Sequence, residues 1–77
     1  EDARDRRITE RAIESLGKIG PKAAVAIPLL ETYLYRGWYV AAAALARMGD
    51  PGVKVLTAAL ENVDLDVRRA AALALSE

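Results

Sequence analysis

Two carboxylates, Glu10 and Glu14, are the residues of this sequence best spaced for acid–base chemistry. They lie four positions apart, so both would sit on one face of a helix. Arg7, Arg11 and Lys18 surround them along the same segment. We therefore expect an exposed ion-pair face, in which each pair contributes about a few tenths of a kcal/mol, rather than a general acid and base.

Other familiar catalytic groups are missing from the sequence or lack partners. The chain has no histidine and no cysteine, which removes imidazole bases, thiolate nucleophiles, disulfides and the usual zinc ligand sets. Ser15 and Ser76 have no base at helical reach and lie in no nucleophile elbow. Lys22 follows Gly20 and Pro21 without the glycine spacing or the preceding strand of a phosphate-binding loop. We expect no catalytic residue, no cofactor and no metal.

The charge balance argues against nucleic-acid and membrane partners. Eleven basic residues offset eleven acidic ones among the 77 residues, so the net charge is zero. The segment 1–22 holds six basic residues against five acids, which is a poor balance for gripping DNA. Those six are Arg4, Arg6, Arg7, Arg11, Lys18 and Lys22.

Length and hydropathy predict one small domain over 1–77 in a cytoplasmic setting. No apolar run approaches the roughly 20 residues that cross a bilayer, and the charged start EDARDRR is the opposite of a signal peptide. The sequence begins without Met and stops inside a predicted helix. We expect either a natural fragment or an engineered repeat protein.

The helices expected to position any functional residue recur along the chain as a repeated sequence pattern. One apolar pattern occurs three times, at intervals of 29 and 30 residues. Its equivalent positions are Ala12, Ala41 and Ala71, together with Leu16, Leu45 and Leu75. A period of this size predicts stacked helices, because each unit alone cannot bury its apolar face.

Helical spacing and turn residues predict five helices, in two full repeats over about 5–36 and 37–63 and a half repeat over about 64–77. The helices are expected over 5–18, from about 28 to 34, over 38–48, from Asp50 and from Asp64. Asp50, followed by Pro51, and Asp64 are the predicted N-caps, while Gly20 and Gly37 mark chain reversals. The predicted inward positions are Ile8, Ala12, Leu16 and Ile19, then Ile27, Leu30 and Leu34, then Val53, Leu56 and Leu60, and finally Val67, Ala71, Ala74 and Leu75.

Three segments of the sequence resemble a known family of helical repeats. The segments AIESLGKIGPKAAVAIPLL (12–30), AAALARMGDPGVKVLTAAL (42–60) and DVRRAAALAL (66–75) resemble HEAT repeats, of the short HEAT-like class found in phycobilin lyases and bacterial scaffold proteins. The resemblance implies an all-α, right-handed α–α superhelix with the first helix of each repeat on the convex side. The middle repeat departs from the pattern, since Gly37, Trp38 and Tyr39 stand where the last repeat has Val67, Arg68 and Arg69.

The resemblance also implies where a partner would bind. The second helices line the concave side in this class, and their candidate contact residues here are Glu31, Tyr35, Lys54, Thr57 and Glu61. The aromatic residues Trp38 and Tyr39 are candidate anchors because such rings bury much area with few rotatable bonds. The alternative, which we favour, is that they fill the shortened joint between the repeats.

The last predicted helix defines a candidate association face. Its stripe of Val67, Ala71, Ala74 and Leu75 has no following helix to cover it, so we expect it to pack on another copy or on a further segment. The sequence therefore predicts a non-catalytic scaffold module that binds protein or self-associates, as a homo-oligomer or as part of a longer array. The alternative is a truncated part of a HEAT-like enzyme, of the lyase or DNA glycosylase type, whose chemistry lies outside these residues.

Overall fold

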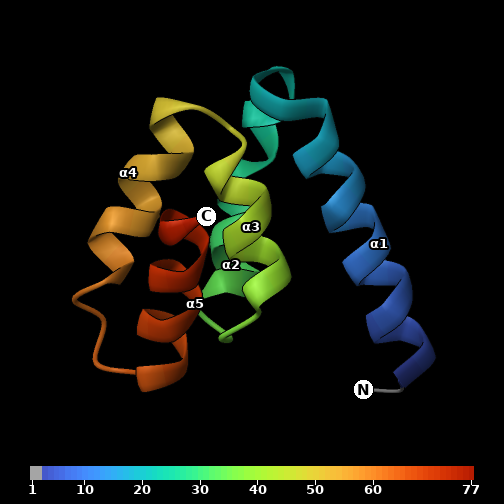
Figure 1. Cartoon of the computed structure of the whole chain (residues 1–77). Helices are drawn as coiled ribbons and strands as arrows, with labels where there is room; N and C mark the ends of the chain where they lie inside the picture. The colour runs from blue at the N-terminus through green and yellow to red at the C-terminus, as the bar shows by residue number, and fades with distance from the viewer. Residues whose placement is uncertain (1–2) are drawn as a thin grey trace.

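The computed structural model describes residues 3–77, and this part of the chain is helical without strands. Five α-helices and one 3₁₀-helix follow one another (Figure 1). They are α1 (Ala3–Ile19), the 3₁₀-helix η1 (Gly20–Ala26), α2 (Ile27–Leu34), α3 (Tyr39–Ala46), α4 (Asp50–Ala59) and α5 (Leu65–Ser76). The all-α class is confirmed for these residues. The first two residues of the expected charged start lie outside the described part.

The helices alternate in direction. In Figure 1 the chain runs upward along α1, α3 and α5 and downward along α2 and α4. The helix α3 packs against α1 and α5, while α2 and α4 pack against α3, against α5 and against each other. The N-terminus of α1 and the start of α5 consequently lie at the same end of the molecule, on opposite sides of α3 (Figure 1).

Local sequence explains where the helices begin and end. Gly37 turns the chain between α2 and α3 with a φ of +84°, a left-handed conformation that glycine adopts without strain. Asp64 caps α5, because its Oδ1 accepts hydrogen bonds from the backbone amides of Asp66 at 2.8 Å and of Val67 at 3.4 Å. The predicted cap at Asp50 is wrong: Gly49 occupies the N-cap position and supplies no side-chain bond. Asp50 lies instead in the first turn, where its charge favours the helix dipole.

The core is built from leucines set between thin, alanine-rich helices. Its largest fully buried side chains are Ile13, Leu30, Leu34, Leu45, Met48, Leu56 and Val67. Glycines permit the closest helix contacts. A Cβ on Gly52 would lie 1.9 Å from the Leu45 carbonyl oxygen, so α4 can begin directly against the end of α3 only without a side chain at residue 52.

The inward face of α1 differs from the predicted one. Ile13 and Gly17 are buried, whereas Ile8, Ala12 and Ile19 are exposed. The reason is that α3, which packs on α1, covers the side that carries Gly17, and this side is not the predicted one. Of the four predicted positions Leu16 packs against the core, where it is half-buried, so the apolar period predicted the helix correctly and most of its buried side wrongly.

Two further predicted faces need correction. In α4, Leu56 is buried as predicted, but Val53 and Leu60 are each more than a third exposed. In α5, Val67, Ala71 and Ala74 are buried and Leu75 is half-buried, so the prediction of an uncovered stripe is wrong. The earlier helices α3 and α4 cover this face, which does not need a sixth helix.

Candidate protein-interaction surfaces

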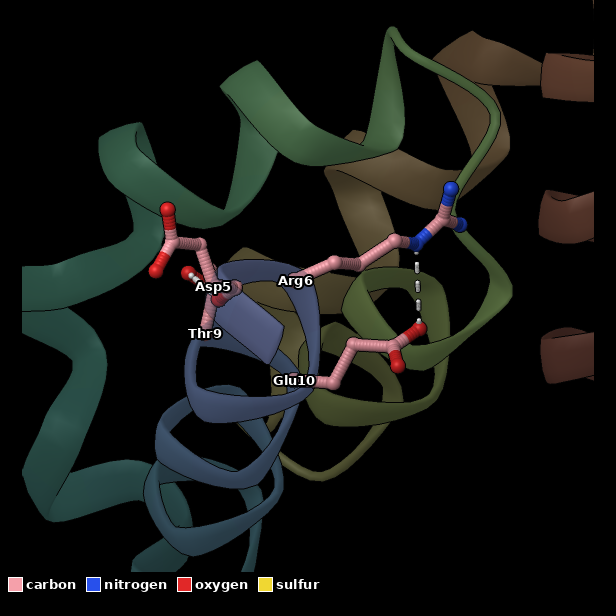
Figure 2. A network of polar contacts seen from close by, with 4 residues as sticks. All are labelled: Asp5, Arg6, Thr9 and Glu10. Atoms are coloured by element: carbon pink, nitrogen blue, oxygen red, sulfur yellow. Dashed lines mark hydrogen bonds and ion pairs between the residues drawn. The ribbon is translucent and has the colours of Figure 1, made fainter. Parts of the chain in front are cut away.

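Of the two carboxylates considered for catalysis, Glu10 is half-buried and Glu14 is exposed. Glu10 pairs with Arg6, whose Nε lies 3.6 Å from the Glu10 Oε2, rather than with Arg7 or Arg11 (Figure 2). On the same turn the Thr9 hydroxyl donates to the Asp5 carbonyl oxygen at 3.0 Å (Figure 2). The Glu10 carboxylate and the Thr9 hydroxyl both bond within α1, which is typical of an exposed helical surface.

Trp38, in the turn before α3, contacts side chains of α1 and α2. The Trp38 side chain is 5% exposed and lies against Tyr33, with ring centroids 4.7 Å apart. The Arg6 guanidinium carbon lies 4.3 Å from the Trp38 ring centroid on another side, and Arg36 lies 5.3 Å from that of Tyr33. Trp38 therefore fills the short joint between the repeats and presents no open ring face to a partner.

Tyr39, the second aromatic candidate, remains exposed. Its hydroxyl donates a hydrogen bond to Oε2 of Glu77 at 2.5 Å, which links the start of α3 to the residue that follows α5. Because the neutral phenol donates to this carboxylate, the hydrogen bond raises the pKa of Tyr39 above its ordinary value of 10.0, with smaller contributions from desolvation and from the Glu77 charge. Tyr39 is thus available to a partner only at its exposed ring.

A groove of about 490 Å³ follows the outer side of α3 between α1 and α5. Its floor is apolar and includes Val40, Ala43 and Ala74, while Glu14, Lys18, Arg47 and Glu77 place charges of both signs on its rim. A smaller hollow of about 260 Å³ lies on α1 between Arg4, Arg7, Ile8 and Arg11. In neither hollow does a carboxylate face a basic side chain across a buried position, as a general acid and base would. Both suit contact with another surface better than the capture of a small substrate.

The five candidates predicted for a concave face lie on or beside α2 and α4. Tyr35, Lys54, Thr57 and Glu61 are exposed, and Glu31 is half-buried. The Thr57 hydroxyl is engaged with the Val53 carbonyl oxygen at 2.9 Å. Although α2 and α4 touch each other, neither of the two hollows includes any of the five.

The repeat register identifies a surface at the α1 side that sequence reasoning missed. Ile19 is 58% exposed, whereas Met48, its equivalent 29 residues later, is 1% exposed. Ala12 is exposed, whereas its equivalents Ala41 and Ala71 are fully buried. Ser15 follows the same rule, since it is exposed and its equivalents Ala44 and Ala74 are buried. We call the set Ala12, Ser15, Ile19 and Leu29 the N-terminal edge. Leu29 belongs to it because it is exposed, while its equivalent Val55 packs on the core.

A second set of exposed positions lies on α4, at its end and on α5, and we call Val53, Leu60 and Ala72 the C-terminal edge. Leu60 is 39% exposed, but Leu34, its equivalent 26 residues earlier, is completely buried. Val53 is likewise exposed while its equivalent Ile27 packs against the core. Ala72 is exposed while its equivalent Ala42 is completely buried.

The signal for both edges was present in the sequence. The exposed positions of the two edges lie on α1, α2, α4 and α5, and each is apolar or small in the sequence pattern. Periodicity marks such positions, but it does not say whether another helix covers them.

No helix within residues 3–77 is long and apolar enough to cross a bilayer. In the same part of the chain, no cluster of three or more acidic side chains is placed to hold a metal ion. Comparison of the chain with protein-family models, with curated proteins and with solved structures finds no match. The HEAT-like assignment consequently remains a prediction from the sequence.

Proposed function

We propose that this chain is a HEAT-like helical repeat module that binds protein, including further copies of itself, through the edges of its helix stack and performs no catalysis. The observation that carries the proposal is the burial contrast between equivalent positions. Ile19 and Leu60 are exposed, while Met48 and Leu34 are completely or almost completely buried. The sequence retains apolar residues at positions that only a neighbouring unit would cover.

The free energy that burial of these side chains would contribute supports the proposal. Burying a Leu, Ile or Val side chain contributes about 1.5–3 kcal/mol. A domain of 77 residues has little stability in reserve, so several such side chains left in water are a notable loss. A partner that covers either edge regains part of that free energy, and the edges are therefore the surfaces most suited to association.

The polar contacts of the described residues support binding over chemistry. Arg6 is held by Glu10 and Trp38, Asp64 is held by the amides of α5, and Tyr39 is held by Glu77. Each contact fixes the helix stack. In this proposal the right-handed superhelix and a concave surface that includes Tyr35, Thr57 and Glu61 complete the module.

A concentration series of amide NMR spectra on the isotope-labelled chain tests the proposal. We expect amide shifts to change with concentration at residues 12–19, 53–60 and 72–76 and to stay constant around the exposed turn at Val25. Spectra that do not change up to about millimolar concentration would remove self-association as the function, since millimolar affinity is the weak limit of specific contacts. A hydrolytic or transfer activity that disappears in Glu10→Gln or Glu14→Gln would overturn the assignment as non-catalytic.

A further inference from the structure

We infer that copies of this chain associate head to tail, with the N-terminal edge of one copy seated on the C-terminal edge of the next. The inference rests on the proposed function and names its partner as a second copy in one orientation. It follows from how the repeats already pack inside the chain.

The first helices of successive repeats are α1 and α3, and the face that α1 presents to α3 differs from the face that α3 presents to α1. Gly17 of α1 faces Ala44 of α3, and a Cβ on Gly17 would lie 3.2 Å from the Ala44 Cβ. In the repeat register, the last equivalent of Gly17 is Ser76, and the first equivalent of Ala44 is Ser15. Both serines are exposed.

A second copy placed by the same step therefore sets its Ser15 against Ser76 of the first copy. Its Ala12 then lies near Ala72, where the internal contacts bury the equivalent pair Ala41 and Ile13. Residues on both sides are small, so α1 of the second copy can approach α5 as closely as α1 approaches α3. The internal interface thus specifies the shape of each edge as the complement of the other.

Helix direction favours the same orientation. The helices α1 and α5 run the same way, with their N-terminal ends at one end of the molecule (Figure 1). The α1 helix of a copy placed by the same step therefore runs parallel to α5, as α3 runs parallel to α1.

A contact between two like edges and a contact between two unlike edges predict assemblies of different size. An isologous contact uses one edge twice and stops at a dimer, whereas a heterologous contact leaves a free edge on every assembly and continues. The head-to-tail inference therefore predicts a mass that keeps rising with concentration past the dimer.

Sedimentation velocity on two complementary variants tests the inference. Ala12→Glu blocks the N-terminal edge alone and Ala72→Glu blocks the C-terminal edge alone, both at exposed helix positions where glutamate is a good helix former. We expect each variant to associate at least about tenfold more weakly than the unmodified chain, because a glutamate side chain does not fit a close contact between small residues. An equimolar mixture should form a dimer that grows no further, since it contains one intact pair of unlike edges.

The control is Ala58→Glu, at an exposed position of α4 whose repeat equivalent, Thr32, is also exposed. It should associate like the unmodified chain, and circular dichroism should show native helix content in all three variants. A dimer that persists in Ala12→Glu alone or in Ala72→Glu alone would overturn the head-to-tail orientation and leave the proposed function standing. An unmodified chain that stays monomeric, with amide shifts independent of concentration, would overturn the head-to-tail inference and remove self-association from the proposed function.

Discussion

Gly17 and Ala44 bring two helices into backbone contact: a Cβ on Gly17 would lie 3.1 Å from the Ala44 Cα. No side chain separates α1 from α3 at this point. The contact therefore fixes both the spacing of the two helices and the side of α1 that is buried, and it leaves Ala12 and Ile19 facing outward.

Enlarging residue 17 should force the two helices apart. We expect Gly17→Leu to lower the free energy of unfolding by about 1–3 kcal/mol, the usual cost of overpacking a close contact. Gly17→Ala should change it by less than about 1 kcal/mol, because the gain in helix propensity offsets a small displacement of Ala44. Urea unfolding followed by circular dichroism measures both variants. A Gly17→Leu variant as stable as the unmodified chain would contradict the close contact.

Removing the charge above Trp38 should weaken the joint between α1 and α3. We expect Arg6→Gln to lower the free energy of unfolding by about 0.5–1 kcal/mol and to increase quenching of Trp38 fluorescence by acrylamide. Arg7→Gln, on the exposed side of the same helix, is the control and should change neither quantity. Equal quenching in the two variants would show that Arg6 does not cover the ring.

Asp64 supplies the clearest helix cap in the chain. Asp64→Ala should lower the free energy of unfolding by about 0.5–2 kcal/mol, since it leaves the amides of Asp66 and Val67 without their acceptor. Asp64→Asn keeps a carbonyl oxygen at the same place and should lose only a fraction of that amount. Thermal unfolding under identical conditions compares the two, and an equal loss in both would rule out the hydrogen bonds as the cause.

The hydrogen bond between Tyr39 and Glu77 should be visible in a pH titration. Because the folded state raises the Tyr39 pKa above 10.0, the resulting stability is present below that pH and is lost as the pH rises through the raised value. We expect Glu77→Gln to lower the Tyr39 pKa toward its ordinary value, as read from the chemical shift of its ring carbons. An unchanged titration in Glu77→Gln would mean that the carboxylate does not hold the phenol in solution.

The sequence was sufficient to predict the features that depend on local signals. The positions of the five helices follow from apolar spacing, and the reversal at Gly37 and the cap at Asp64 follow from residue type. Gly49 displaced the predicted Asp50 cap because a glycine with positive φ ends the preceding turn and leads directly into α4. Local chemistry permitted either cap, so residue type alone could not decide between them.

The side of each helix that is buried depends on the neighbours it has in space. Periodicity marked Ala12 and Ile19 as apolar positions, yet a helix with a neighbour on one side only must leave the other in water. Gly17 gave no hydropathy signal, although it forms the closest contact of α1. The stripe of Val67 and Ala71 was predicted to need a further helix, because the cover provided by α3 and α4 is a long-range contact. The bond from Tyr39 to Glu77, 38 residues apart, is equally beyond local reasoning.

Association should cover both edges, and single cysteines measure this directly because the chain has none of its own. Ala12→Cys and Ala72→Cys place one thiol on each edge, and Ala58→Cys places one on the exposed control position. Association through the two edges predicts that a thiol reagent modifies both edge cysteines more slowly as protein concentration rises, while the control rate stays constant. Modification rates that are the same at every concentration for all three variants would contradict it.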